Sequence, residues 1–272
     1  MPDPDRDPIV LRDAAVAMAL EAGAIVREGH GRTHRPERKG RIDLVTEYDR
    51  RSEALILSRL NERFPDHAVL AEESGAHQGG AVRWLVDPLD GTTNFAHGYP
   101  FFCVSIGVEV EGVLTAAAVY DPIREEMFSA ALGHGATCNG EPIRVSEAAE
   151  LEDALLVTGF PYDVREHPER HLPLFQDFLT RAQGVRRDGS AALNLCYLAI
   201  GRFDGFWEGN LSPWDLAAGV LIVREAGGRV TEYAGGAFRL EGRQIVAGND
   251  LLHARLLEVL AHHHTAWLRP AE

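Results

Sequence analysis

The stretch Trp84-Leu-Val-Asp-Pro-Leu-Asp-Gly-Thr-Thr-Asn-Phe95 is the most informative part of this 272-residue chain. Its apolar start predicts the end of a buried strand, and Pro88, which has no N–H to donate, predicts that the chain leaves the sheet at Asp87. Asp90 then lies on the following turn, and Gly91 lets the backbone approach a ligand closely. Carboxylates bind hard cations such as Mg²⁺, and N–H groups at a helix start bind phosphate oxygens. The stretch therefore offers both parts of a metal-assisted phosphate site.

The same residues have a simpler interpretation, because Asp, Pro, Gly and Asn are ordinary turn formers. The functional interpretation depends on three further acidic clusters. In the first, Glu72 follows a short apolar run at residues 69–71 that predicts a buried strand. Glu72 and Glu73 point to opposite sides of an extended chain, so only one of them faces a given site, and we assign Glu72 to it.

The other two clusters lie at predicted helix starts. Thr46 and Asp49 form a possible capping box before one helix, and Ser212 and Asp215 form another before a second helix. Capping alone accounts for both aspartates, so their function is inferred from the company they keep. In α/β sheets, strand ends and helix starts gather in a crevice where ligands bind. The carboxylates placed in this way are Glu72, Asp87, Asp90 and Asp215.

In this arrangement the chain resembles the inositol monophosphatase family of Mg²⁺-dependent phosphatases. The combination of Asp87-Pro-Leu-Asp-Gly-Thr-Thr93 with Trp214-Asp-Leu-Ala-Ala-Gly219 is very specific, whereas either half alone is suggestive. The resemblance covers about residues 10–260 and implies an α/β fold, a layered αβαβα sandwich. It also implies an N-terminal half, residues 1–145, that carries most metal ligands. A C-terminal half, residues 146–272, would carry Asp215 and the substrate-specificity residues.

The resemblance further implies roles for single residues. Two or three Mg²⁺ ions would be held by Glu72, Asp87, Asp90, Asp215 and the backbone carbonyl of Leu89. Thr92 would hydrogen-bond the attacking water, and Asp49 would polarise Thr92. The N–H groups of Gly91 and Thr92 would hold the phosphate, while Gly189, Ser190, Ala191 and Glu208 would bind the alcohol part of the substrate. The supporting residues would be Asp43, Glu73 and Lys39.

The charge of the chain limits its partners. A formal net charge of -14 and a pI of about 5.3 make a nucleic-acid backbone an unsuitable partner. Bound metal would make the phosphate site locally positive. Three cysteines, the absence of a signal-peptide pattern and the absence of a long apolar run predict a cytoplasmic protein with free thiols and no membrane contact. The resemblance adds a homodimer.

The predicted function is hydrolysis of inositol monophosphate, with inhibition by lithium as the resemblance implies. Fructose-1,6-bisphosphatase, 3'-phosphoadenosine phosphatase and histidinol-phosphate phosphatase share the metal motifs and stay open as alternatives. Residues 94–98 and 205–208 look more like the inositol phosphatases. A different class is a regulatory protein of the transcription machinery that uses this fold. The complete set of carboxylates would be unnecessary for that role.

Overall fold

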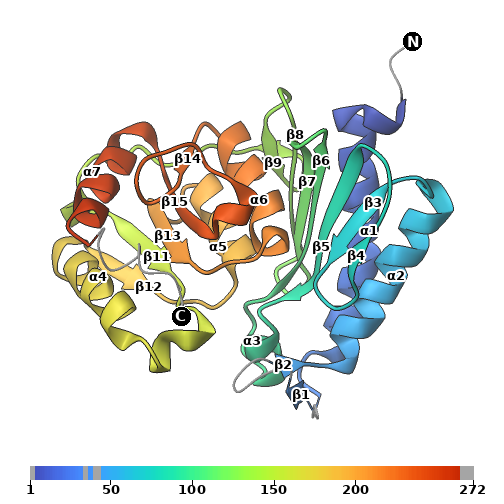
Figure 1. Cartoon of the computed structure of the whole chain (residues 1–272), viewed down its shortest axis with the longest axis horizontal. Coiled ribbons are helices and arrows are strands. Elements are labelled where there is room, and N and C mark those ends of the chain that lie inside the picture. Colours follow the sequence, from blue (N-terminus) through green and yellow to red (C-terminus); the bar gives the residue numbers. More distant parts are fainter. Residues whose placement is uncertain (1–3, 33–35, 39–43, 264–272) are drawn as a thin grey trace.

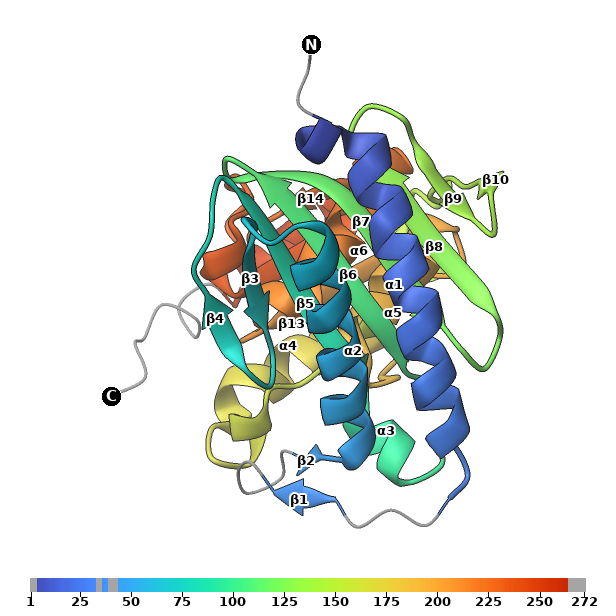
Figure 2. The ribbon, with the colours of Figure 1, turned by 90° about the vertical axis from the view of Figure 1, so that its right-hand side faces the viewer.

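The computed structural model describes residues 4–32, 36–38 and 44–263, which form alternating layers of helices and sheets (Figure 1). Helices α1 (Pro8–Gly29) and α2 (Glu47–Arg63) cover the outer face of an eight-stranded sheet, as Figure 2 shows. Helices α5 (Ala191–Ala199) and α6 (Pro213–Glu225) fill the space between that sheet and a five-stranded sheet. The order of these layers is set by the apolar faces of both sheets, each of which is buried against helices.

The eight-stranded sheet has the order β10-β9-β8-β7-β6-β5-β3-β4. Only β3 and β5 pair in parallel, and a two-residue turn with positive φ at Glu111 and Gly112 joins β6 to β7 as the sequence predicts. A separate pair, β1 (Glu37–Arg38) and β2 (Leu44–Val45), lies beside the start of α2. The strands of the large sheet are β3 (Ala68–Ala71), β4 (Gly75–His77), β5 (Val82–Asp90), β6 (Cys103–Val110), β7 (Val113–Asp121), β8 (Glu126–Ala131), β9 (Ala136–Cys138) and β10 (Glu141–Pro142).

The five-stranded sheet has the order β12-β11-β13-β15-β14, and its outer face is covered by α4 (Pro168–Arg181) and α7 (Asp250–Ala261). The strands are β11 (Leu155–Thr158), β12 (Gly184–Arg186), β13 (Gly205–Gly209), β14 (Arg229–Thr231) and β15 (Gln244–Gly248). The layers follow the expected αβαβα sandwich, so the predicted fold class is confirmed. The expected boundary after residue 145 falls between the two sheets, and its status as a domain boundary stays a prediction.

Small residues let α6 lie close to its neighbours. A Cβ atom on Gly107 of β6 would lie 2.6 Å from the Cβ atom of Ala217 on α6. A Cβ atom on Gly219 would lie 2.6 Å from two side-chain carbons of Leu195 on α5. The run Ala217-Ala-Gly219 therefore serves packing, because it brings the start of α6 near both the large sheet and α5.

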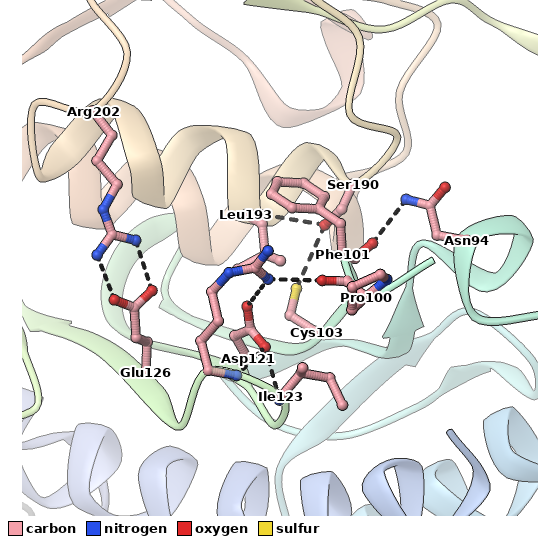
Figure 3. Close-up of polar contacts among 11 residues, drawn as sticks. Asn94, Pro100, Phe101, Cys103, Asp121, Ile123, Glu126, Ser190, Leu193 and Arg202 are labelled. Carbon is pink, nitrogen blue, oxygen red and sulfur yellow. Dashed lines mark hydrogen bonds and ion pairs between the residues drawn. The ribbon is translucent and has the colours of Figure 1, made fainter. Parts of the chain in front are cut away.

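Polar contacts also join α5 to the large sheet (Figure 3). The guanidinium of Arg202, just after α5, pairs with both carboxylate oxygens of Glu126 on β8 and lies over the ring of Tyr197 at 4.4 Å. The ring of Tyr197 in turn meets Phe101 edge-on at 5.5 Å. These contacts fix the second half of the chain against the loop before β6.

Two further expectations can be compared with the described residues. The three cysteines Cys103, Cys138 and Cys196 are free, as expected, and Cys103 and Cys196 are buried. Among the described residues, no helix is both long enough and apolar enough to cross a membrane.

Gly107→Ala tests the close packing of α6 on the sheet. The added methyl group would meet Ala217 and the backbone N of Ala218 at 2.6–2.9 Å, so we expect a loss of about 1–3 kcal/mol in the free energy of unfolding. Gly236→Ala is the matched control, because nothing lies within 4 Å of the added atom there. Chemical denaturation of both variants measures the difference. An unchanged midpoint for Gly107→Ala would show that the helix can shift at no cost.

Candidate active site

The stretch from Asp87 to Asp90 stays in the sheet for longer than the sequence predicts. Strand β5 runs through Pro88 to Asp90, so the prediction that the chain leaves the sheet at Asp87 is wrong. Asp87 pairs with Ser105 and Asp90 pairs with Cys103, and the register shifts between the two pairs. The irregularity accommodates a proline that cannot donate to the ladder. It also places both carboxylates near the same strand end.

Gly91 then turns the chain into helix α3 (Thr92–Ala96), as predicted. Its φ of 98° lies in the left-handed region, and a Cβ atom there would be 2.9 Å from the carbonyl oxygen of Phe101. The N–H groups in the first turn of a helix have no partner within the helix. Gly91, Thr92 and Thr93 line a cavity of about 520 Å³, so this turn borders a space large enough for a small ligand.

The predicted metal ligands meet in that cavity. Glu72 follows β3, as expected, whereas Asp87 and Asp90 come from β5 and Asp215 comes from the first turn of α6. Burial raises the pKa of Asp87 well above its ordinary value, and the charges of the other three carboxylates raise it further. Burial, followed by the charge of Asp90, does the same to the pKa of Asp215. All four side chains and Leu89 line the cavity.

These groups fit a hard divalent cation, because all their donor atoms are oxygens and their mutual repulsion would be relieved by positive charge. Among the described residues, no three His, Cys, Asp or Glu side chains are already drawn together as in a formed metal site. The carboxylates thus face one cavity and raise one another's pKa without being in ligand contact. A cation bound among them would draw their oxygens inward.

Asp90 also joins the two halves of the chain. Its Oδ2 atom accepts hydrogen bonds from the hydroxyl of Ser190 at 2.7 Å and from the N–H of Ala192 at 2.7 Å. Ser190 is buried and also caps α5, and its Oγ atom lies 3.7 Å from the Sγ atom of Cys103 (Figure 3). The predicted substrate surface, Gly189 to Ala191, therefore lines the cavity while it holds a proposed metal ligand in place.

Thr92 and Asp49 form the predicted pair. The Thr92 hydroxyl lies 2.9 Å from Oδ1 of Asp49 and 2.9 Å from the carbonyl oxygen of Leu89. The other carboxylate oxygen of Asp49 accepts from the N–H of Thr46 at 2.8 Å, which confirms the capping box. Asp49 is fully buried, and burial raises its pKa while its hydrogen bonds oppose that rise. Asp49 is therefore both a helix cap and the partner of a cavity-lining hydroxyl.

Asp215 has the same double use. Its Oδ2 atom accepts from the N–H of Ser212 at 2.7 Å, as the predicted capping box requires, and its side chain also lines the cavity. Glu208, at the end of β13, lines the opposite side and is 8% exposed. Burial raises the pKa of Glu208 to about 8, against the opposing charge of Arg187. A Cβ atom on Gly159 would lie 1.9 Å from Oε1 of Glu208, so that position has no room for a side chain.

Some predicted residues lie elsewhere. The side chain of Glu73 borders a neighbouring cavity, and its N–H donates to the buried Glu53 at 2.8 Å. Asp43 and Lys39 lie outside the described residues. Their supporting roles stay predictions.

Sequence reasoning missed Asn94 and three arginines. The Nδ2 atom of Asn94 donates to the carbonyl oxygens of Phe101 at 2.8 Å and Asp188 at 2.7 Å, so it ties α3 to the loop before α5. Its place in the Asp-Gly-Thr-Thr-Asn motif was the available signal. The arginines come from loops far apart in sequence, and no spacing connects them: Arg165, Arg187 and Arg243.

Comparison with known proteins agrees with this geometry. Residues 7–265 match the inositol monophosphatase family. The chain is 48% identical to an inositol-1-monophosphatase of Synechocystis over 254 residues, covering 92% of this chain and 88% of that protein. It is 43% identical to the Nus factor SuhB of Salmonella typhimurium over 239 residues, covering 86% and 90%.

The fold agrees as well. The structure of an inositol monophosphatase from Anabaena matches with a TM-score of 0.85 and 42% identity, covering 95% of this chain and 98% of that one. Both the family match and these relatives extend over nearly the whole chain. The chain belongs to the inositol monophosphatase family, and it is a phosphatase.

Proposed function

We propose that this phosphatase hydrolyses inositol monophosphates, and related small polyol phosphates, with the help of Mg²⁺. The observation that carries the proposal is the meeting of four carboxylates and the first turn of α3 in one cavity. The name of the Synechocystis relative, an inositol-1-monophosphatase, supports the choice of substrate. Inhibition by lithium and assembly into a homodimer belong to the same proposal.

The proposed metal ligands are Glu72, Asp87, Asp90, Asp215 and the carbonyl oxygen of Leu89. When bound, two or three divalent ions would stabilise the charge that develops on the phosphoryl oxygens and lower the pKa of water. Hydrolysis of phosphate monoesters needs such help, because its uncatalysed rate is up to ~10²¹-fold slower than the enzymic rate. The first-turn N–H groups of α3 would hold the phosphate in place.

Thr92 and Asp49 would handle the proton of the attacking water. The Thr92 hydroxyl donates toward Oδ1 of Asp49 at 2.9 Å, which leaves its oxygen free to accept from a water in the cavity. Burial raises the pKa of Asp49, which makes this carboxylate a better proton acceptor. The proton would pass from the water to Thr92 and from Thr92 to Asp49.

A role in the transcription machinery is a second candidate function. It is favoured by the 43% identity to a protein named Nus factor SuhB. The net charge of -14 speaks against a direct RNA contact, so a protein partner suits the surface better. A pull-down with RNA polymerase and its elongation factors tests this role. Retention of those factors by an inactive Asp90→Asn protein would separate the two functions.

The first prediction concerns metal dependence. We expect excess EDTA to abolish phosphate release and added Mg²⁺ to restore it. Asp90→Asn should fold normally and lose nearly all activity, because an amide cannot balance the charge of a cation. Asp13→Asn, a change of an exposed carboxylate on α1, is the control with the same loss of charge. Asp90 is not a ligand if its variant keeps more than about a tenth of the rate, a change of roughly 1.4 kcal/mol in barrier.

The second prediction concerns the Thr92 hydroxyl. Thr92→Ala should lower kcat by roughly 10²–10⁴-fold with little change in KM, because its partner is the water and not the substrate. Thr93→Ala, on the same turn but exposed, is the matched control. Asp49→Asn should add little to Thr92→Ala in a double-mutant cycle, since the two residues act as a unit. Fully additive effects would contradict a shared proton path.

The third prediction concerns Glu208. Glu208→Ala should lower kcat/KM for inositol 1-phosphate by an amount equivalent to roughly 1.5–3 kcal/mol, because hydrogen bonds to two ring hydroxyls are lost. p-Nitrophenyl phosphate, which has no such hydroxyls, should be hydrolysed at a nearly unchanged rate. Because the pKa of Glu208 is raised to about 8, the neutral Glu208→Gln should retain more activity than Glu208→Ala near pH 7. Equal losses on both substrates would reassign Glu208 to the support of the fold.

A further inference from the structure

Three arginines surround the end of β13 at one edge of the five-stranded sheet. Arg187 directly follows β12, and Arg165 ends a short 3-10 helix (Tyr162–Arg165) that follows β11. Strands β12, β11 and β13 run in parallel, so the segments after them leave the sheet at the same edge. Strand β15 is antiparallel to β13, with Gly209 opposite Gln244, so Arg243 just before β15 lies at that edge too. We name Arg165, Arg187 and Arg243 the arginine rim.

The arginine rim belongs to the same cavity as the carboxylates. All three side chains line it, together with Glu208 and the first turn of α3. The backbone holds two of them in place. The carbonyl oxygen of Arg243 accepts the N–H of Asn210 at 2.6 Å, and the Asp188 carbonyl beside Arg187 is bound by Asn94.

The rim arginines differ from many others in the chain by their lack of an acidic partner. Arg59 pairs with Glu21 at 2.8 Å, Arg83 pairs with Glu109 at 2.8 Å, and Arg202 pairs with Glu126. Within the described parts of the chain, none of the rim guanidinium groups has a carboxylate at ion-pair distance. Glu208 is near enough to feel the charge of Arg187, yet it balances at most one of the three.

Unpaired positive charge is unexpected in a protein with a net charge of -14. Carboxylates are abundant on its surface, so three arginines without a partner at one cavity edge indicate that their partner is a ligand. Guanidinium groups bind phosphate and carboxylate oxygens in pairs of parallel hydrogen bonds, which gives direction as well as charge. The reacting phosphate belongs at the opposite side, beside α3 and the four aspartate and glutamate side chains.

We propose that the arginine rim binds a second anionic group, a phosphate or a carboxylate, on the alcohol part of the substrate. This inference rests on the proposed phosphatase function and narrows its substrate class. The favoured substrates are phosphate esters whose alcohol carries negative charge on the side away from the ester. Glu208, in the middle of the rim, would bind the hydroxyls that lie between the two anionic groups.

Two matched pairs of substrates test the proposal and separate its two chemical sources. Fructose 1,6-bisphosphate and fructose 1-phosphate differ by a second phosphate, whereas 2-phosphoglycerate and glycerol 2-phosphate differ by a carboxylate. With Mg²⁺ present, we expect the wild-type kcat/KM to be at least about tenfold higher for the more charged member of one pair, roughly the value of one charge-assisted hydrogen bond. The pair that shows the preference identifies the anionic group.

Charge-neutralising variants locate the effect. Arg187→Gln and Arg243→Gln should each lower that preference by about tenfold. Arg186→Gln is the matched control, because Arg186 is the exposed neighbour of Arg187, loses the same charge and does not line the cavity. The control should keep the wild-type preference.

Three results would overturn the proposal. Equal kcat/KM within both pairs would remove the second subsite while leaving the phosphatase function intact. Equal losses for both members of a pair in Arg187→Gln would mean that the rim attracts all phosphates alike. Hydrolysis of none of the four compounds would overturn the proposed function together with this inference.

Discussion

The concentration of negative charge between the two sheets is the constraint on which the rest of this structure depends. Like charges in a buried cavity raise one another's pKa and cost folding free energy unless donors or cations balance them. The chain meets that cost with its own backbone. One oxygen of each key carboxylate accepts a hydrogen bond from a nearby N–H group, and the side chain still borders the cavity or its Thr92 hydroxyl. The pairs are Asp49 with Thr46, Asp87 with Leu89, Asp90 with Ala192 and Asp215 with Ser212.

This arrangement removes the choice between capping and function that the sequence leaves open. A helix start gives an aspartate two advantages, because the first-turn N–H groups bind one oxygen and the helix dipole favours the negative charge. The carboxyl group is then fixed in direction before any cation arrives. Capping is therefore the means by which Asp49 and Asp215 are oriented toward the cavity, and preorganised groups of this kind reduce the cost of reaching the transition state.

The comparison of sequence and structure follows the range of each interaction. The capping boxes, the end of β3 at Glu72 and the turn at Gly91 depend on residues close in sequence, and all of them could be predicted. The passage of β5 through Pro88 could not, since it depends on a register shift against β6. The bridge made by Asn94 joins segments that are far apart in the chain. The arginine rim needs the strand order β12-β11-β13-β15, which local patterns do not contain.

The proposed division of labour between the sheets explains how one family can serve several substrates. Three of the four proposed side-chain ligands come from the ends of β3 and β5, and the fourth begins α6, which is held against the large sheet by Gly107 and Ala217. The surface for the alcohol comes instead from loops at the edge of the five-stranded sheet. Changes in those loops alter the alcohol that fits and leave the carboxylates in place. Because Asp90 alone is bound by the start of α5, it is the point where the two parts must agree in position, and a shift of one sheet against the other would be felt there first.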